Sequence, residues 1–347
     1  MREAWKQSGI GLDKSDGDET ASISVVIPSY QRPQSLRKCL KALDRQTWLP
    51  KEVIVVCRTT DTLSIEVVRK WELDARCYQK SLALVEEPGQ VAALRIGTQA
   101  VTSELVAYTD DDTVPEPDWL ERIASYYKDR SVGGVGGRDV IDGVRSLRTA
   151  SRVGVLTWYG KLIGNHHVGC VGVRSVDVLK GANASFRTSL VQFPDFLRGD
   201  GAQVHNEVYV CLRIRSMGYS LIYDPAIQVL HYPGPRFDRG GRGGVVRSAI
   251  RDAAFNGHVS MLLYLPWPMK VVRSVYSVVL GHRGSPGLFR WLLGCIRGER
   301  DIRLSFIPTQ LGHLDGTKFY FHHHVLHRLF KATTSSLPKT GERLKEL

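Results

Sequence analysis

The sequence has few cysteines, and none of them stand in a pattern that would crosslink the chain or bind zinc. The six are scattered without a Cys-x-x-C pair, at positions Cys39, Cys57, Cys77, Cys170, Cys211 and Cys295. Such spacing is typical of small buried apolar side chains in a reducing compartment and excludes a disulfide framework. We therefore expect buried thiols and a cytoplasmic protein.

Long hydrophobic runs are also absent. Residues 1–20 are polar and acidic, without the apolar core of a signal peptide, and we expect a disordered N-terminal tail there. No later stretch reaches the roughly 18–20 uninterrupted apolar residues that a bilayer span needs. No internal repeat or low-complexity tract is found. The sequence thus predicts a folded chain without a transmembrane helix.

Acidic residues are scarce towards the C-terminus. Residues 236–347 contain 18 Lys and Arg against 7 Asp and Glu, an excess of 11 within a net charge of +12 for the whole chain. An imbalance of this size favours an anionic partner, which is either nucleic acid or the anionic leaflet of a membrane. Composition alone leaves both open.

Hydrophobic periodicity in the first two thirds predicts alternating strands and helices. Strands are expected at 23–27, 53–56, 82–85 and 105–109, and helices at 34–46, 91–101, 117–127 and 208–217. This alternation predicts an α/β fold with a mainly parallel sheet, helices on both faces, and ligands at the carboxyl ends of the strands. The four glycines of 131–137 predict a loop, and two short strands are expected at 221–223 and 227–230.

The glycine- and arginine-rich segment 235–244 is the clearest linker. It divides the chain into a catalytic domain, residues 21–235, and a basic, mainly helical extension, residues 236–347. Helices are expected in the extension at 245–257 and 288–296. A run of three histidines, 322–324, is interpreted as a solvated or interfacial cluster, because adjacent residues of a helix point in different directions.

Three consecutive carboxylates, Asp110, Asp111 and Asp112, follow directly after the expected strand 105–109. Like charges this close repel one another unless a cation compensates them. Mg²⁺ or Mn²⁺, which binds one or two carboxylates together with phosphate oxygens, would do so. A solvated acidic turn explains the triplet equally well, so the residues alone leave both interpretations open.

Several motifs in order, from Ser24 to Pro233, resemble the bacterial family-2 glycosyltransferases of the GT-A fold. The segments that carry the resemblance are VVIPSYQRPQSLRKCLKAL (25–43), TDDDTVPEPDWL (109–120), GANASFR (181–187) and HNEVYVCLRIRSMGYSLIYDPAIQVLH (205–231). The resemblance implies an inverting transfer of one sugar from a UDP-, GDP- or dTDP-sugar to a glycan or lipid-linked acceptor. Such a reaction belongs to cell-surface glycan or polysaccharide synthesis.

The resemblance also implies roles for single residues on the donor side. The nucleotide site is assigned to Pro28, Ser29, Tyr30, Arg32, Asp61, Arg95, Asp110 and Asp111, and the metal site to Asp110, Asp112 and His231. Two departures bear on these assignments. Cys57-Arg58 stands where the family has paired aspartates, so Asp61 is assigned in their place, and Leu94-Arg95 stands where an Arg-Asn pair is common.

On the acceptor side, the resemblance makes Glu207 the general base, because it occupies the second position of the family's Glu-Asp pair, here Asn206-Glu207. Gly181, Ala182, Asn183 and Asn206 are assigned to the acceptor. A carboxylate in the first turn of a helix is the alternative reading of Glu207. The chain lacks a Gln-x-x-Arg-Trp motif, which argues against a processive synthase.

The extension interleaves aromatic and basic residues between 264 and 297. This pattern is typical of helices that lie in a bilayer interface, although packing on the catalytic domain or a dimer contact would also account for it. We expect peripheral contact with the inner face of the cell membrane and no nucleic-acid partner. Two alternatives stay open: an inactive sugar-nucleotide-binding or scaffold relative, and a basic nucleic-acid-binding protein.

Overall fold

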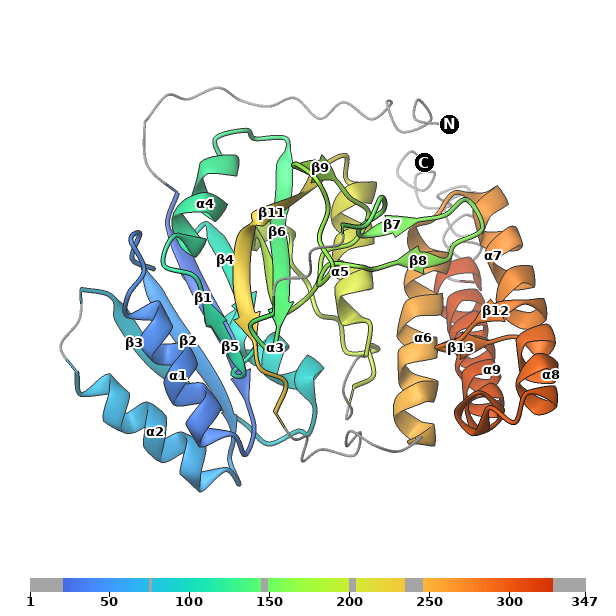
Figure 1. The fold of residues 1–347 in the computed structure, drawn as a ribbon, viewed down its shortest axis with the longest axis horizontal. Coiled ribbons are helices and arrows are strands. Elements are labelled where there is room, and N and C mark those ends of the chain that lie inside the picture. Colours follow the sequence, from blue (N-terminus) through green and yellow to red (C-terminus); the bar gives the residue numbers. More distant parts are fainter. Residues whose placement is uncertain (1–20, 75–76, 145–148, 200–203, 235–245, 327–347) are drawn as a thin grey trace, which may run out of the picture.

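The computed structural model describes residues 21–74, 77–144, 149–199, 204–234 and 246–326, and Figure 1 shows their arrangement. An α/β region comes first and a cluster of helices follows it. We call the described residues up to 234 the sheet part and residues 246–326 the helical part. The expected tail, 1–20, and the expected linker, 235–244, lie outside the described residues.

One mixed sheet forms the centre of the sheet part, with the order β3-β2-β1-β4-β10-β6-β11-β5 and with β9 paired to β11. β3, β2, β1 and β4 are parallel, and β10 runs antiparallel between β4 and β6. The carboxyl ends of β1 and β4 therefore meet at one edge. The strands are β1 (Ile23–Ser29), β2 (Glu52–Arg58), β3 (Gln79–Val85), β4 (Leu105–Thr109), β5 (Thr113–Pro115), β6 (Val132–Ile141), β9 (Arg174–Ser175), β10 (Asn183–Arg187) and β11 (Ser220–His231).

Helices cover both faces of this sheet, as the alternating pattern predicts. The helices are α1 (Pro33–Leu43), α2 (Thr62–Glu72), α3 (Gln90–Gln99), α4 (Trp119–Tyr126) and α5 (Asn206–Ser216), with the short 3-10 helix η1 (Thr188–Leu190) after β10. Buried residues of α1, α2 and α4 share one core, and those of α3 and α5 share the other. In α1 the buried Leu36, Leu40 and Leu43 recur at helical spacing, which gives the helix one apolar face.

The loop predicted at 131–137 is wrong, because these residues belong to the central strand β6. Its glycines leave room for neighbours that pack against the backbone. A Cβ at Gly134 would lie 2.6 Å from the ring of Phe186, and one at Gly136 would lie 2.6 Å from the carbonyl oxygen of Asn183. At Gly137 it would overlap the carbonyl oxygen of Ile227. Glycine marks a close approach here rather than a turn.

Two further expectations are corrected. The strands predicted at 221–223 and 227–230 form one strand, β11, with a register shift between Asp224 and Gln228 where it pairs with β6. The expectation of buried cysteines holds for four residues, whereas Cys77 and Cys295 are exposed; all six are free thiols.

The helical part contains α6 (Arg247–Tyr264), α7 (Trp267–Val279), β12 (Gly281–His282), β13 (Ser285–Pro286), α8 (Leu288–Ile296), α9 (Arg300–Tyr320) and the π-helix η2 (Phe321–Leu326). α6 packs along α9 and also contacts α5 of the sheet part. A hairpin of β7 (Val155–Leu156) and β8 (Leu162–Ile163) reaches from the sheet part to α7 (Figure 1), where the rings of Tyr159 and Tyr276 lie 4.9 Å apart.

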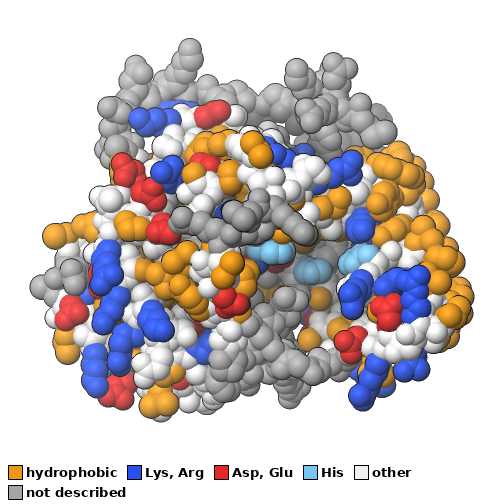
Figure 2. All heavy atoms as spheres, viewed as in Figure 1, with side chains coloured by type: hydrophobic (Ala, Val, Ile, Leu, Met, Phe, Trp, Pro, Cys, Tyr) orange, Lys and Arg blue, Asp and Glu red, His pale blue; other side chains and the backbone are white. Residues whose placement is uncertain are grey.

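Hydrophobic side chains are exposed along the outer margin of the helical part (Figure 2). They recur at helical spacing on three helices: Trp267, Val271, Val275 and Val278 on α7, Leu288, Phe289, Leu292 and Ile296 on α8, and Ile307, Leu311 and Leu314 on α9. We call these residues the apolar margin. Within the described residues, no helix is both long and apolar enough to cross a bilayer.

Candidate active site

The acidic triplet lies at the sheet edge where β1 and β4 end. Asp111 faces β1: the hydroxyl of Ser29 donates to Asp111 Oδ2 at 2.7 Å, and Arg32 Nη2 lies 2.8 Å from Asp111 Oδ1. The carboxyl is fully buried. Burial outweighs the charge of Arg32 and raises the pKa of Asp111 to about 7. Asp111 therefore ties the turn after β1 to the acidic cluster.

Asp112 is held by three groups. Arg32 Nη1 lies 2.5 Å from Asp112 Oδ2, and the backbone N–H of Gly234 donates to the same oxygen at 3.1 Å. His231 Nε2 lies 3.2 Å from Asp112 Oδ1. Burial opposes ionisation, but the hydrogen bond from His231 and the charge of Arg32 outweigh it and lower the pKa of Asp112 to about 2. Asp112 is thus an anion at neutral pH.

His231, the last residue of β11, lies between two carboxylates. Its Nδ1 is 3.6 Å from Asp139 Oδ2 on β6, and that oxygen also pairs with Lys180. Burial disfavours the imidazolium, yet the hydrogen bonds to Asp112 and Asp139 prevail and raise the pKa of His231 to about 9. Arg32, His231 and Lys180 together compensate a dense group of carboxylates.

The geometry fits a divalent cation. Asp110, Asp112 and His231 each offer one ligand atom, and these atoms lie within 4.8 Å of one another; the described residues contain no other such group of His, Cys, Asp and Glu. Asp112 Oδ1 is buried, and His231 Nε2 lies 3.2 Å from it. Burial and the charge of Asp112 raise the pKa of Asp110. Two carboxylates and an imidazole suit Mg²⁺ or Mn²⁺.

The remaining donor-side residues line the turns after β1 and β2. Pro28 and Tyr30 are half-buried, and the guanidinium of Arg58 lies 4.8 Å from the centre of the Tyr30 ring. Both oxygens of Asp61 accept backbone N–H groups, from Gln31 at 2.5 Å and from Ser64 at 3.1 Å. Asp61 is thus the N-cap of α2, and its predicted contact with the base stays a prediction.

The described contacts of Arg95 lie outside the acidic cluster, and its assignment to the nucleotide stays a prediction. Its guanidinium donates to the carbonyl oxygens of Phe193 and Pro194 and lies 3.1 Å from Asp195. The residue of α3 that reaches the cluster is Gln90, whose Nε2 is 3.4 Å from Asp110 Oδ1. Gln90 is the first residue of α3, more than one helical turn before Arg95.

The acceptor-side residues have different surroundings. The side chain of Asn183 accepts from Trp119 Nε1 at 2.8 Å and donates to the carbonyls of Arg138 and Ile227, and its predicted contact with an acceptor stays a prediction. The carbonyl of Ala182 accepts from Thr109 at 3.0 Å, whereas a Cβ at Gly181 would meet nothing within 4 Å.

Glu207 lies in the first turn of α5, beside the buried Asn206. Its carboxyl is half-buried and, within the described residues, makes no hydrogen bond or ion pair. A carboxylate without a partner is available to accept a proton from a ligand. The residue before Asn206, His205, has φ 55°, a left-handed conformation that few side chains adopt. The chain therefore turns sharply just before the predicted base.

Three residues of the cluster escaped the sequence motifs: Asp139, Lys180 and Gln90. Asp139 is opposite Val229 in the register of β6 with β11, two positions before His231. Only the pairing of β6 with β11 brings Asp139 to His231. The sequence signal that could have indicated Asp139 is the polar pair Arg138-Asp139, which follows the glycines of β6.

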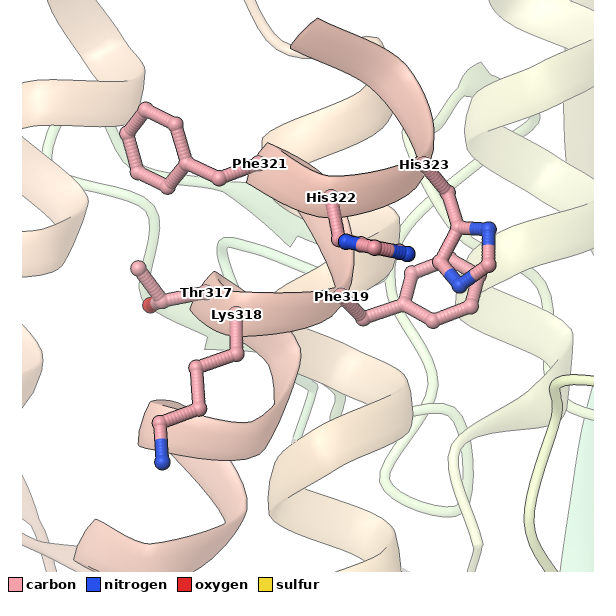
Figure 3. A pocket seen from close by; sticks show the side chains of 6 residues that line it. All are labelled: Thr317, Lys318, Phe319, Phe321, His322 and His323. Atoms are coloured by element: carbon pink, nitrogen blue, oxygen red, sulfur yellow. The ribbon is translucent and has the colours of Figure 1, made fainter. Parts of the chain in front are cut away.

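The histidine run 322–324 does not extend this site. His322 and His323 are exposed on η2, and the ring of His323 stacks on Phe319 at 4.5 Å. Figure 3 shows a shallow pocket that they line together with Thr317, Lys318 and Phe321. The interpretation as a solvated cluster agrees with this exposure.

Comparison with known proteins relates the chain to one enzyme family. The family model described as "Glycosyl transferase family 2" matches residues 24–174. Glycosyltransferase AglE of Haloferax volcanii is 32% identical over 120 residues, which cover 33% of this chain and 38% of that protein. The pre-mycofactocin glycosyltransferase of Mycobacterium tuberculosis is 26% identical over 222 residues, 62% of this chain and 43% of that protein. The chain thus spans less than half the length of either relative.

Among solved structures, GalNAc-T7 with UDP, GalNAc and Mn²⁺ resembles this chain with a TM-score of 0.52 at 14% sequence identity. The likeness covers 82% of this chain and 58% of that one. At 14% identity this structural likeness shows a similar fold only. The likeness extends beyond residues 24–174, which the family model matches.

Proposed function

We propose that the chain is a member of glycosyl transferase family 2, whose model matches residues 24–174, and that it transfers one sugar from a nucleotide-activated donor to an acceptor hydroxyl. The proposal includes a divalent cation, Mg²⁺ or Mn²⁺, and inversion at the anomeric carbon. It assigns the reaction to residues 21–235 and membrane contact to residues 236–347.

The observation that supports this proposal best is the meeting of Asp110, Asp112 and His231 at the ends of β4 and β11. Carboxylates repel a diphosphate unless cations compensate them, so a metal ion here would help a donor to bind. When bound, the cation neutralises the charge that develops on the leaving nucleoside diphosphate. Arg32, which pairs with Asp111 and Asp112, is placed to contact the same phosphates.

The chain's own residues would then direct the attack. The carboxylate of Glu207 accepts the proton of the acceptor hydroxyl, and the hydroxyl oxygen forms a bond to the anomeric carbon. The bond between that carbon and the phosphate oxygen breaks, and the nucleoside diphosphate leaves with the electron pair. The half-buried carboxyl of Glu207, which has no partner among the residues that the structure describes, suits this proton transfer.

Donor turnover tests the metal site. The purified chain is incubated with UDP-, GDP- and dTDP-sugars in EDTA, Mg²⁺ or Mn²⁺, and release of the nucleoside diphosphate is measured. We expect release from one donor class, only with metal, and a loss of about 100-fold or more in Asp110→Asn. Asp110 is preferred to Asp112 because, among the described residues, its carboxylate accepts a hydrogen bond only from Gln90, whereas that of Asp112 holds Arg32, Gly234 and His231.

Asp74→Asn is the matched control, because this exposed aspartate lies at the end of α2. Full turnover by Asp110→Asn, or turnover by the unaltered chain in EDTA, would remove the metal from the proposal.

Replacement of Glu207 by Gln tests the base. Because the amide cannot accept a proton, we expect transfer to fall about 100- to 10,000-fold, while donor binding, measured by nucleotide displacement, stays within a factor of two. Glu72→Gln, an exposed change on α2, is the control. Equal transfer rates in Glu207→Gln and the control would exclude Glu207 as the base.

Membrane contact is the second part of the proposal. The apolar margin presents three helical stripes without a partner in the described structure, and Ile296 and Trp267 are 81% and 74% exposed. The exposed Arg283 and Arg297 accompany these stripes, a combination that binds anionic bilayer surfaces. A protein so placed would act at the inner face of the cell membrane.

Co-sedimentation with anionic and neutral vesicles tests the membrane contact. We expect binding to anionic vesicles that weakens with salt and falls at least tenfold when Trp267→Ser is combined with Ile296→Ser. Leu73→Ser is the control, because Leu73 is 85% exposed on the sheet part. Unchanged vesicle binding together with a monomer-to-dimer difference between the proteins would instead identify the margin as a dimer contact.

A further inference from the structure

Arg273 on α7 is a buried cation without an anion. Its side chain is 6% exposed, its Nε has no hydrogen-bond partner, and within the described residues it forms no ion pair. Its guanidinium lies 5.8 Å from the centre of the Tyr276 ring. Burial lowers the pKa of Arg273 to about 10. A buried charge without a partner costs several kcal/mol, so an arriving anion would relieve that cost.

Two histidines from other helices lie beside this cation. The rings of His258 on α6 and His313 on α9 are 4.9 Å apart, and both residues are almost fully buried. His258 Nε2 is 3.0 Å from the hydroxyl of Thr317, and His313 Nε2 is 3.4 Å from that of Ser285. The Nδ1 atom of each ring has no hydrogen-bond partner. Each ring therefore has a nitrogen that a ligand could use.

The cations Arg273 and Lys161 act on these rings, and burial disfavours the protonated form of each ring. Burial, followed by the charges of Arg273, His205 and Lys161, lowers the pKa of His282 on β12 to about 4. Burial and then Arg273 lower the pKa of His258 to about 3. Burial and the charges of His258, Arg273 and His282 lower that of His313. Among the described residues, no carboxylate acts on any of the three.

The cluster lies where the sheet part meets the helical part. Gly160, in the turn of the β7–β8 hairpin, sits so close to Arg273 that a Cβ there would lie 3.0 Å from Arg273 Cβ. His205 precedes α5 and faces Gly257 of α6, with Nδ1 3.3 Å from where a Cβ of Gly257 would be. His205 is two residues before Glu207, so the cluster borders the predicted base.

We propose that Arg273, His258, His282 and His313, with Lys161 and His205 at the border, bind a phosphate or diphosphate group of the acceptor. A guanidinium and imidazole N–H groups are the donors that recognise such groups. The identification as the acceptor rests on the proposed function: the donor diphosphate goes to the metal site, whereas the acceptor hydroxyl must reach Glu207. The N-terminus of α5, which no side chain among the described residues caps, adds to the attraction for an anion.

Binding of inorganic pyrophosphate tests this inference without donor or catalysis. Calorimetric titration is carried out on the whole chain in EDTA, where the carboxylates of the donor site repel the probe. We expect one pyrophosphate per chain, with affinity reduced at least tenfold in Arg273→Gln and about threefold in Lys161→Gln. Arg37→Gln, which removes an exposed charge from α1, is the matched control and should bind as the unaltered chain does.

Lys161 is half-buried on the hairpin, so its variant keeps the test decisive if Arg273→Gln does not fold. No pyrophosphate binding by the unaltered chain, or equal binding by Lys161→Gln, Arg273→Gln and the control, would overturn the inference.

The same titration with a short-chain prenyl diphosphate identifies the kind of acceptor. Tighter binding than pyrophosphate identifies a lipid-linked acceptor, and equal binding identifies a water-soluble phosphorylated one. Donor turnover is measured in a separate experiment. Loss of the proposed function therefore does not exclude the anion site, and absence of the anion site does not exclude the proposed function.

Discussion

His231 carries a proton that a metal ion would have to displace. With a pKa of about 9, the imidazole is charged at pH 7, and only its neutral form can bind a cation. We therefore expect Mn²⁺ affinity to rise as the pH increases towards 9 and then to level off. Calorimetry at pH 7.5 in buffers of different ionisation enthalpy should show about one proton released per ion from this residue.

His231→Gln provides the comparison, because it keeps a polar side chain that does not titrate in this range. If proton release on Mn²⁺ binding is the same in both proteins, His231 is not a ligand and the assignment is withdrawn.

Arg32 compensates the same carboxylates as the proposed metal. Its guanidinium contacts Asp111 and Asp112 at 2.8 and 2.5 Å. Removing it in Arg32→Gln leaves buried negative charge, which should cost about 2–3 kcal/mol of stability in EDTA. Mn²⁺ should restore much of this loss and bind the variant several-fold more tightly. Thermal denaturation with and without Mn²⁺ measures both effects, and equal melting temperatures in EDTA would contradict the expectation.

At the residue scale, the sequence predicts those members of the site that its motifs contain. Asp110, Asp112 and His231 could be assigned because a strand end and a known spacing mark them. Asp139 and Lys180 reach His231 through strand pairing between distant segments, and no local pattern encodes that pairing. The motif position of Asn183 likewise does not reveal that its amide makes three hydrogen bonds within the sheet part, and its contact with an acceptor stays a prediction.

Among the elements, β6 shows how composition can mislead. Four glycines suggest flexibility, yet in β6 they admit the neighbouring strands and the ring of Phe186. The long α9 escaped prediction for a related reason: its buried residues include Pro308, Gly312 and Gly316, which ordinarily interrupt a helix, and a Cβ at Gly316 would lie 3.3 Å from the ring of His258 on α6. The β-α-β units were predictable because their apolar periodicity is local.

The close approach at β6 gives a stability prediction. A methyl group at Gly137 would overlap the backbone of Ile227, so we expect Gly137→Ala to cost about 3 kcal/mol. That loss corresponds to a fall in Tm of roughly 6–12 °C. Gly181→Ala is the control, because its new methyl group meets nothing within 4 Å. Similar melting temperatures for the two variants, measured by circular dichroism, would show that β6 tolerates side chains.

For the whole molecule, the buried histidines make stability depend on pH. The pKa of His258 is about 3 in the folded protein and about 6.5 when unfolded. Between these values the unfolded chain binds more protons, so this residue lowers stability as the pH falls below 6.5. The effect reaches about 2 kcal/mol at pH 5 relative to pH 7.

The comparison of the unaltered chain with His258→Asn isolates this effect. The raised pKa values of Asp110 and Asp111 act in the opposite direction, but they act equally in both proteins and cancel in the difference. Urea denaturation at pH 7 and pH 5 should show the variant gaining about 2 kcal/mol relative to the unaltered chain. If the difference in unfolding free energy between the two proteins is the same at pH 7 and pH 5, the pKa of His258 is not lowered in the folded protein.

The bond from the Gly234 N–H to Asp112 has a consequence for the main chain. The main chain leaves the donor cluster at this residue and next appears in the described structure at the start of the helical part. Whatever ligand rearranges Asp112 therefore also displaces the main chain at Gly234.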